Sequence, residues 1–87
     1  MNTRTKIAAA GNTSAPALAV LRQLGYTVTR EATGQRLFRA ENQQCSLIAE
    51  DPLLLLGLAK LFEVRGGNWK PNDAEIAELL ALDRDDA

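Results

Sequence analysis

The segment DPLLLLGLAKLFEVRGG, residues 51–67, determines the expected fold because helix signals mark both of its ends. Asp51 offers an acceptor to free N–H groups of a first turn, and Pro52 occupies a position where no intrahelical donor is required. A glycine pair then ends the helix. The apolar side chains that share one side of it are Leu54, Leu55, Leu58, Leu61 and Phe62. The segment therefore predicts a helix over residues 52–65 that packs on a sheet.

The same helix carries apolar residues on the side that should face solvent. Leu53, Leu56 and Val64 lie near Gly57, and a glycine inside a helix costs about 1 kcal/mol relative to alanine. A glycine also permits close approach of another backbone. The helix is therefore expected to have neighbours on two sides. The second neighbour is either the last helix of this chain, a partner protein or a second copy that forms a homodimer.

Upstream, three short alternating segments predict an antiparallel meander: residues 26–30, 36–41 and 45–50. Their turns are expected at residues 31–35 and 42–44. A helix precedes them, opening at Thr13 or Ser14 as a cap and ending at Gly25. The apolar residues 6–10 before that helix are a candidate for a short fourth strand.

Downstream, Asn72 and Glu75 have the spacing of a capping box and predict a last helix. Its apolar stripe consists of Ile76, Leu79 and Leu80. The acidic residues 83–87 are expected to fray. The sequence thus predicts a small α+β fold with the order β-α-β-β-β-α-α, one sheet covered on one face by helices, and a single domain over residues 1–82.

Composition disfavours catalysis in this chain of 87 residues. There is no histidine, and Cys45 is the only cysteine, so histidine-based acid–base chemistry, intrachain disulfides and the usual Cys/His zinc sites are excluded. We therefore expect no enzyme, no cofactor and no metal. Cys45 lies on an apolar strand face and is interpreted as a small buried hydrophobe. A single unpaired cysteine and the lack of a membrane-spanning apolar stretch predict a cytoplasmic protein.

The charge pattern favours a protein-binding module of the inhibitor, immunity-type or adaptor kind. Residues 41–87 carry a net charge of −6, with four basic and ten acidic residues, so the expected partner is basic. Trp69 either plugs the gap between two helices or serves as an exposed binding anchor. The candidate partner-binding residues are Leu53, Leu56, Trp69, Glu75, Glu78, Asp83, Asp85 and Asp86.

The alternative is an anion, nucleotide or nucleic-acid binder that uses the basic half, residues 1–40, whose net charge is +5. Arginines and aromatic residues share its strands, as stacking on bases and phosphate contact require. The residues of this alternative are Thr13 and Ser14 at the helix start and Arg30, Arg36 and Arg39 on the strands. The order helix–three strands–helix is similar to that of double-stranded-RNA-binding domains. Glu50 and Asp51, however, stand where that family needs glycine and lysine to hold phosphates. Nucleic acid is therefore the disfavoured partner.

Overall fold

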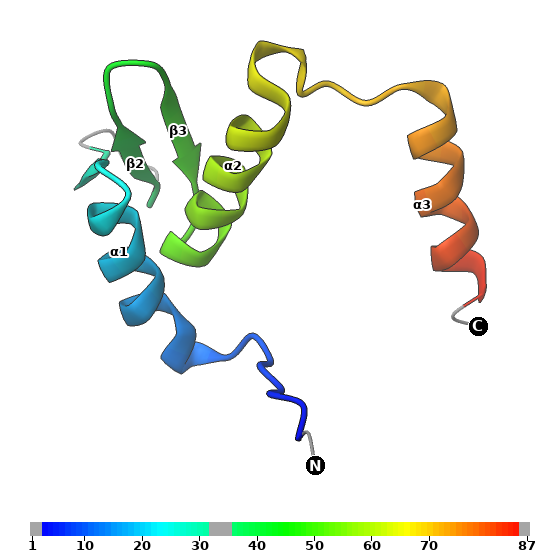
Figure 1. Ribbon diagram of the computed structural model, residues 1–87, viewed down its shortest axis with the longest axis horizontal. Helices are drawn as coiled ribbons and strands as arrows, with labels where there is room; N and C mark the ends of the chain where they lie inside the picture. The colour runs from blue at the N-terminus through cyan, green and yellow to red at the C-terminus, as the bar shows by residue number, and fades with distance from the viewer. Residues whose placement is uncertain (1–2, 32–35, 86–87) are drawn as a thin grey trace.

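The computed structural model describes residues 3–31 and 36–85 of the chain (Figure 1). Its helices and strands follow the order η1 (Gly11–Thr13), α1 (Ser14–Gln23), β1 (Thr27–Arg30), β2 (Phe38–Glu41), β3 (Ser46–Ala49), α2 (Pro52–Arg65), η2 (Gly66–Asn68) and α3 (Asp73–Asp85). The predicted α+β class and the antiparallel meander are confirmed.

The three strands form one antiparallel sheet in the order β1-β2-β3. Ala40 of β2 stands opposite Val28 of β1 and Leu47 of β3, and all three side chains face the core. Because side chains alternate along a strand, Ile48 of β3 points the other way and is exposed. Both β1 and β3 are edge strands of this sheet.

Helices α1 and α2 pack against each other and against the sheet (Figure 1). Leu21 of α1 and Leu55 of α2 are fully buried, and Ala59 belongs to the same core cluster. We call α1, the three strands and α2 the body of the protein. Asp51 caps α2 as predicted, since its carboxylate accepts a hydrogen bond of 2.8 Å from the Leu54 amide.

One local expectation about the N-terminal part of the chain is not met. Residues 6–10 form neither a strand nor a helix and are exposed, so the predicted fourth strand is wrong. This run offers mainly alanine methyl groups, which bury too little apolar surface to hold a strand on the sheet. The backbone of residues 83–85 belongs to α3, and the fraying expected of residues 83–87 stays a prediction. Most of the predicted turn at residues 31–35 lies outside the described residues.

Helix α3 stands apart from the body (Figure 1), which corrects the interpretation that the last helix covers α2. Among the described residues, α3 does not pack extensively against any other helix or strand. The Cα radius of gyration is 15.5 Å, whereas a compact chain of this length has a value of about 12 Å. No helix in the described part of the chain has the length and apolar character needed to cross a membrane.

Candidate partner-binding surface

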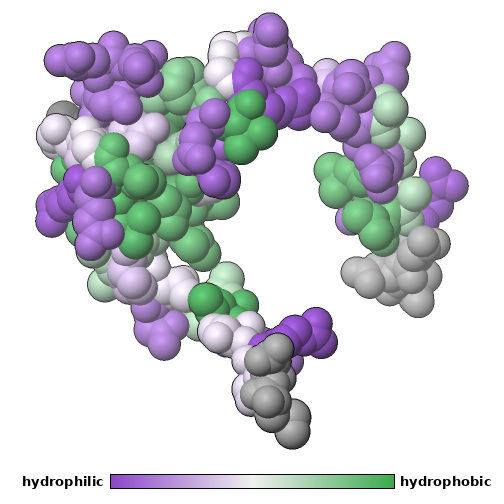
Figure 2. Space-filling view, viewed as in Figure 1, coloured by the Kyte–Doolittle hydropathy of each residue, from purple (hydrophilic) through white to green (hydrophobic). Residues whose placement is uncertain are grey.

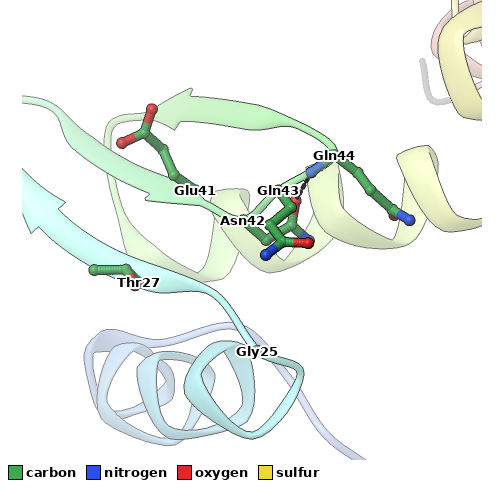
Figure 3. A pocket seen from close by; sticks show the side chains of 6 residues that line it. All are labelled: Gly25, Thr27, Glu41, Asn42, Gln43 and Gln44. Atoms are coloured by element: carbon green, nitrogen blue, oxygen red, sulfur yellow. Dashed lines mark hydrogen bonds between the residues drawn. The ribbon is translucent and has the colours of Figure 1, made fainter.

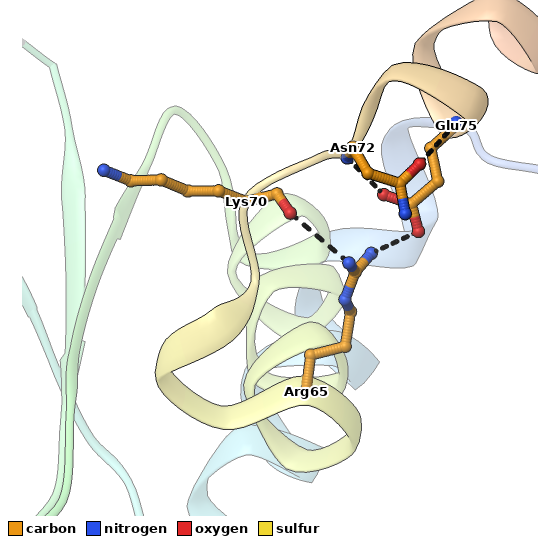
Figure 4. A network of polar contacts seen from close by, with 4 residues as sticks. All are labelled: Arg65, Lys70, Asn72 and Glu75. Carbon is orange, nitrogen blue, oxygen red and sulfur yellow. Dashed lines mark hydrogen bonds and ion pairs between the residues drawn. The ribbon is translucent and has the colours of Figure 1, made fainter.

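Arg65, the last residue of α2, connects the body to α3 (Figure 4). Its Nη1 donates a hydrogen bond of 2.8 Å to Oε2 of Glu75 in α3, and its Nη2 donates one of 3.3 Å to the carbonyl of Lys70 in the connection. One guanidinium thus contacts both the connection and the first turn of the next helix. We call this arrangement the Arg65 bracket; it links the end of α2 to the start of α3.

The start of α3 is a complete capping box (Figure 4). The Asn72 side chain accepts a bond of 2.8 Å from the Glu75 amide, and Glu75 accepts one of 2.9 Å from the Asn72 amide. The Asn72 amide and the Arg65 guanidinium both favour the carboxylate and lower the pKa of Glu75 below its ordinary value. The predicted cap is therefore confirmed, and Glu75 is occupied by contacts within the chain.

The apolar stripe of α3 is exposed. Leu79 is 60 % exposed, and Leu80 is 52 % exposed. Figure 2 shows apolar residues on the side of α3 that faces back across open space toward the body. Large apolar side chains that are exposed along one side of a helix form a candidate contact face for another surface. The exposed large apolar residues of α3 are Ile76, Leu79, Leu80 and Leu82.

The acidic candidates on α3 separate into two groups. Glu75 holds the Arg65 bracket, whereas Glu78 and Asp83 are exposed and available to a partner. The backbone of Asp85 belongs to α3, but its side chain lies outside the described part, as does Asp86 altogether. Reversing the charge of Glu75 would therefore disturb the helix start, while reversing Glu78 would not.

A groove of about 460 Å³ runs between β3 and α2, and Trp69 lines it. Its walls are mostly apolar, with Ile48 from β3 and Leu61 and Phe62 from α2. Trp69 is 48 % exposed and lines a gap between α2 and β3, so it does not plug a gap between two helices; its role as a binding anchor stays a prediction. The helix row Leu58 and Leu61 continues to Leu54, one turn earlier and 51 % exposed. We call this surface the α2–β3 groove.

The outer side of α2 has no neighbour at Gly57. A Cβ atom built there would meet nothing within 4 Å, so no close backbone contact within the described chain requires this glycine. Val64 on the same side is 69 % exposed. Leu53 and Leu56 are half-buried, and Leu56 packs against the core. Leu56 therefore serves the fold, and the open surface lies around Gly57 and Val64.

The strand arginines are engaged within the chain. Arg39 pairs with Glu31 and with Glu41, the latter at 3.5 Å. The hydrogen bond from its guanidinium stabilises the ionised carboxylate of Glu31 and lowers the pKa of Glu31. Arg30 lies over the ring of Phe38, 4.5 Å from its centroid, in a cation–π contact. Arg36 is exposed. The structure thus does not bring the three arginines together as a free basic surface.

The start of α1 differs from its prediction. Thr13 occupies the cap position but makes no side-chain cap bond to α1; its hydroxyl donates instead to the Ala10 carbonyl at 2.6 Å. Ser14 is the first residue of α1 and not its cap. Two residues proposed to hold an anion are therefore used by a local turn and a helix start.

A polar hollow lies beside the turn between β2 and β3 (Figure 3). Asn42 holds this turn, since its Oδ1 accepts bonds from the amides of Gln44 and Cys45 at 2.8 and 2.9 Å. The hollow is wide and open to solvent, and Glu41 at its side pairs with Arg39. Asn42 and Glu41 are therefore engaged in contacts that form the turn and the sheet, and these contacts account for their presence beside the hollow. The remaining residues that line the hollow are Gly25, Thr27 and Gln43.

The described residues contain no group of three or more His, Cys, Asp or Glu side chains that could hold a metal ion. Cys45 is half-buried, and its sulfur lies 3.6 Å from the Tyr26 hydroxyl. Burial, followed by the neighbouring Cys45, raises the pKa of Tyr26 to about 12. A neutral phenol beside a thiol in the core has a packing role.

Ile48 and Arg65 are the surface residues that the sequence reasoning missed. The strand alternation did contain a signal for Ile48, because residues 45, 47 and 49 share the inward face and leave residue 48 outside. Arg65 had no such signal, since its pairing with Glu75 depends on the path of the intervening loop. Comparison of the chain with protein-family models, with curated proteins and with solved structures found no match.

Proposed function

We propose that this chain is a non-enzymatic, cytoplasmic protein-binding module whose binding element is α3. The observation that carries the proposal is the exposed apolar stripe of α3, a helix that stands apart from the body. Large apolar side chains on a projecting helix are the anchors that a groove in a partner accepts. Leu79 and Leu80 supply the apolar anchor in this proposal.

The charge of α3 indicates the kind of surface that its partner presents. Within Asp73–Asp85 there are five acidic residues and one basic residue, a net charge of −4. Glu78 and Asp83 are exposed on this helix, and acidic groups at the rim of an apolar contact select a basic surface and speed its encounter. By analogy of size and charge, we propose that the chain works as an inhibitor, an immunity-type protein or an adaptor.

Paired helix-face variants test the proposal. Leu79→Gln with Leu80→Gln removes the apolar anchors, and Ala74→Gln with Ala81→Gln introduces the same two polar side chains on the opposite side of α3 without removing a large apolar one. Tagged chains would be used to capture proteins from the native host, with quantification by mass spectrometry. We expect a stoichiometric protein that binds the wild type and the alanine-site control and loses about tenfold or more of its affinity for the leucine-site variant.

The opposite results would remove the proposal. Equal capture by both variants would show that the stripe contributes nothing to binding. Recovery of nucleic acid, with binding lost in Arg36→Ala combined with Arg39→Ala, would replace the proposal with the alternative function.

A further inference from the structure

The backbone edge of β3 borders the α2–β3 groove. Among the described residues, β3 has a neighbouring strand only on its β2 side. The groove is lined by Cys45 and Leu47, whose side chains pack against the core, and also by the exposed residues Ser46 and Ile48. Side chains from both faces of a strand meet one groove only where that groove runs along the edge of the strand. The groove is therefore open to the backbone of β3.

The strand register shows which backbone groups of β3 lie on this edge. The amide of Asn42 donates to the carbonyl of Cys45 at 3.0 Å, so these two residues form a hydrogen-bonded pair where the hairpin closes. Hydrogen-bonded and non-hydrogen-bonded pairs alternate along an antiparallel ladder. Leu47 therefore directs its N–H and C=O toward β2, whereas Ser46 and Ile48 direct theirs away from it. No strand of the described chain pairs with the outer groups of these two residues.

The walls of the groove are apolar and uncharged. Leu55 and Ala59 of α2 belong to the core, whereas Leu58 and Leu61 line the groove. Helical periodicity places these two sets about 100° apart, so α2 turns one apolar side to the core and another to the groove. Within the described chain no charged residue lines the groove, and a charged side chain there would lose hydration without an ion partner. The groove therefore accepts apolar side chains.

We propose that the α2–β3 groove binds an extended segment of a partner protein, which pairs with β3 as a fourth strand. The N–H and C=O groups of Ser46 and Ile48 bond to the backbone of that segment. Every second side chain of the added strand points to the α2 side of the sheet and enters the groove. The bound segment thus has apolar residues at alternate positions. This site is separate from the α3 stripe and does not rest on the function proposed above.

The β3 strand of a second copy does not meet this requirement. Its side chains on the α2 side are Cys45, Leu47 and Ala49, and all three pack against the core of their own chain. They are therefore not available to fill a groove in another molecule. The occupant is a segment whose alternate apolar side chains are free before binding.

Amide hydrogen exchange of the free chain, followed by NMR, tests whether the edge is open. At about 50 µM we expect the amides of Ser46 and Ile48 to exchange about tenfold or more faster than the amide of Leu47, which is bonded to β2. Equal protection of all three amides would overturn the proposal, because the edge would then be covered. Protection of Ser46 and Ile48 that grows with protein concentration would identify a second copy as the occupant and would also overturn it.

The binding experiment uses the full chain and a phage-displayed library of random peptides of about nine residues, longer than β3. A synthetic copy of the most enriched peptide is then titrated into the chain. We expect apolar residues at every second position of the enriched peptides and slower exchange at the Ser46 and Ile48 amides in the complex. A library that yields no binding peptide, or a bound peptide that leaves both amides unprotected, would contradict the proposal.

Two substitutions at one position separate backbone pairing from side-chain contact. Ser46→Pro removes an edge donor and leaves the bonds to β2 in place, because this N–H points away from β2. Ser46→Ala is the matched control, since it loses the hydroxyl that accepts from Arg39 at 3.3 Å but keeps the amide. We expect the peptide to bind Ser46→Pro about tenfold or more weakly than the wild type, and Ser46→Ala with unchanged affinity. Equal affinity for both variants would rule out the fourth strand.

Further variants keep the test decisive. Circular dichroism verifies folding; if Ser46→Pro does not fold, Trp69→Ala replaces it, because this exposed residue lines the groove and its loss should weaken peptide binding similarly. Leu79→Gln with Leu80→Gln should bind the peptide like the wild type, since none of the described residues of α3 lines the groove. Loss of peptide binding in that variant would place the peptide on α3 and overturn the separate site. Failure of the peptide experiment leaves the capture experiment on the α3 stripe unaffected.

Discussion

At the scale of single residues, the Tyr26 hydroxyl lies in the core beside the sulfur of Cys45, at 3.6 Å. Burial raises the pKa of Tyr26 from 10.0 to about 12. The folded state therefore holds the phenolic proton more tightly than the unfolded state does. Its contribution to stability is fully present below pH 10 and is lost as pH rises toward 12.

We predict that Tyr26→Phe reduces the alkaline loss of stability. Between pH 10 and 12 the wild type should lose up to about 1.4 kcal/mol of unfolding free energy per pH unit through this group, in addition to the effects of other groups. Urea unfolding of both proteins at pH 8, 10 and 11 measures the difference. Curves that fall in parallel for the two proteins would contradict the assignment of this alkaline sensitivity to Tyr26.

At the scale of secondary-structure elements, α3 depends on its own local interactions. Its 13 residues form a helix without extensive packing against the body, and isolated helices of this length are marginal in water. The capping box of Asn72 and Glu75 therefore carries more weight here than in a packed helix.

We predict that Asn72→Ala lowers the helix content of α3 while leaving the body intact. The variant loses the acceptor for the Glu75 amide, a change that costs about 1 kcal/mol in a typical helix cap. NMR Cα chemical shifts should move toward coil values in residues 73–84 and stay constant in α2. The control Asn68→Ala lies in η2, outside this cap, and should leave α3 helical. Unchanged shifts in α3 would show that something other than the cap holds the helix.

The elements that local chemistry determines could be predicted from the sequence. Asp51 and Pro52 identify the start of α2, and the spacing of Asn72 and Glu75 identifies the start of α3. Each signal acts between residues at most three apart, so the neighbouring sequence contains it. Residues 6–10 show the limit of such reasoning, because an apolar run becomes a strand only when it gains a partner strand.

The arrangement of elements was harder to predict than the elements themselves. The stripe of Ile76, Leu79 and Leu80 was correctly assigned to one side of α3, but periodicity carries no information about which surface that side meets. The same holds for Arg30 and Arg39, whose contacts with Phe38 and Glu31 depend on pairing across the sheet. Local pattern thus predicts a face, and only tertiary structure shows what lies against it.

At the scale of the whole molecule, the projecting helix makes the monomer larger than its chain length requires. The variant Leu79→Gln with Leu80→Gln is the suitable protein for measurement, because it lacks the large exposed apolar side chains of α3. We predict a small-angle scattering radius of gyration near the Cα value of 15.5 Å and clearly above the compact value of about 12 Å. A value near the compact one would mean that α3 folds back onto the body.

The separation of α3 from the body gives the two parts different freedom to change during evolution. Replacing Leu21 or Leu55 with a smaller residue leaves a cavity in the core and destabilises the fold. Selection for a folded protein removes such a substitution, whatever the chain binds. A substitution at Leu79 alters the exposed face of α3 with little cost to the body. The body can thus persist as a constant scaffold while the outer face of α3 diverges toward new partners.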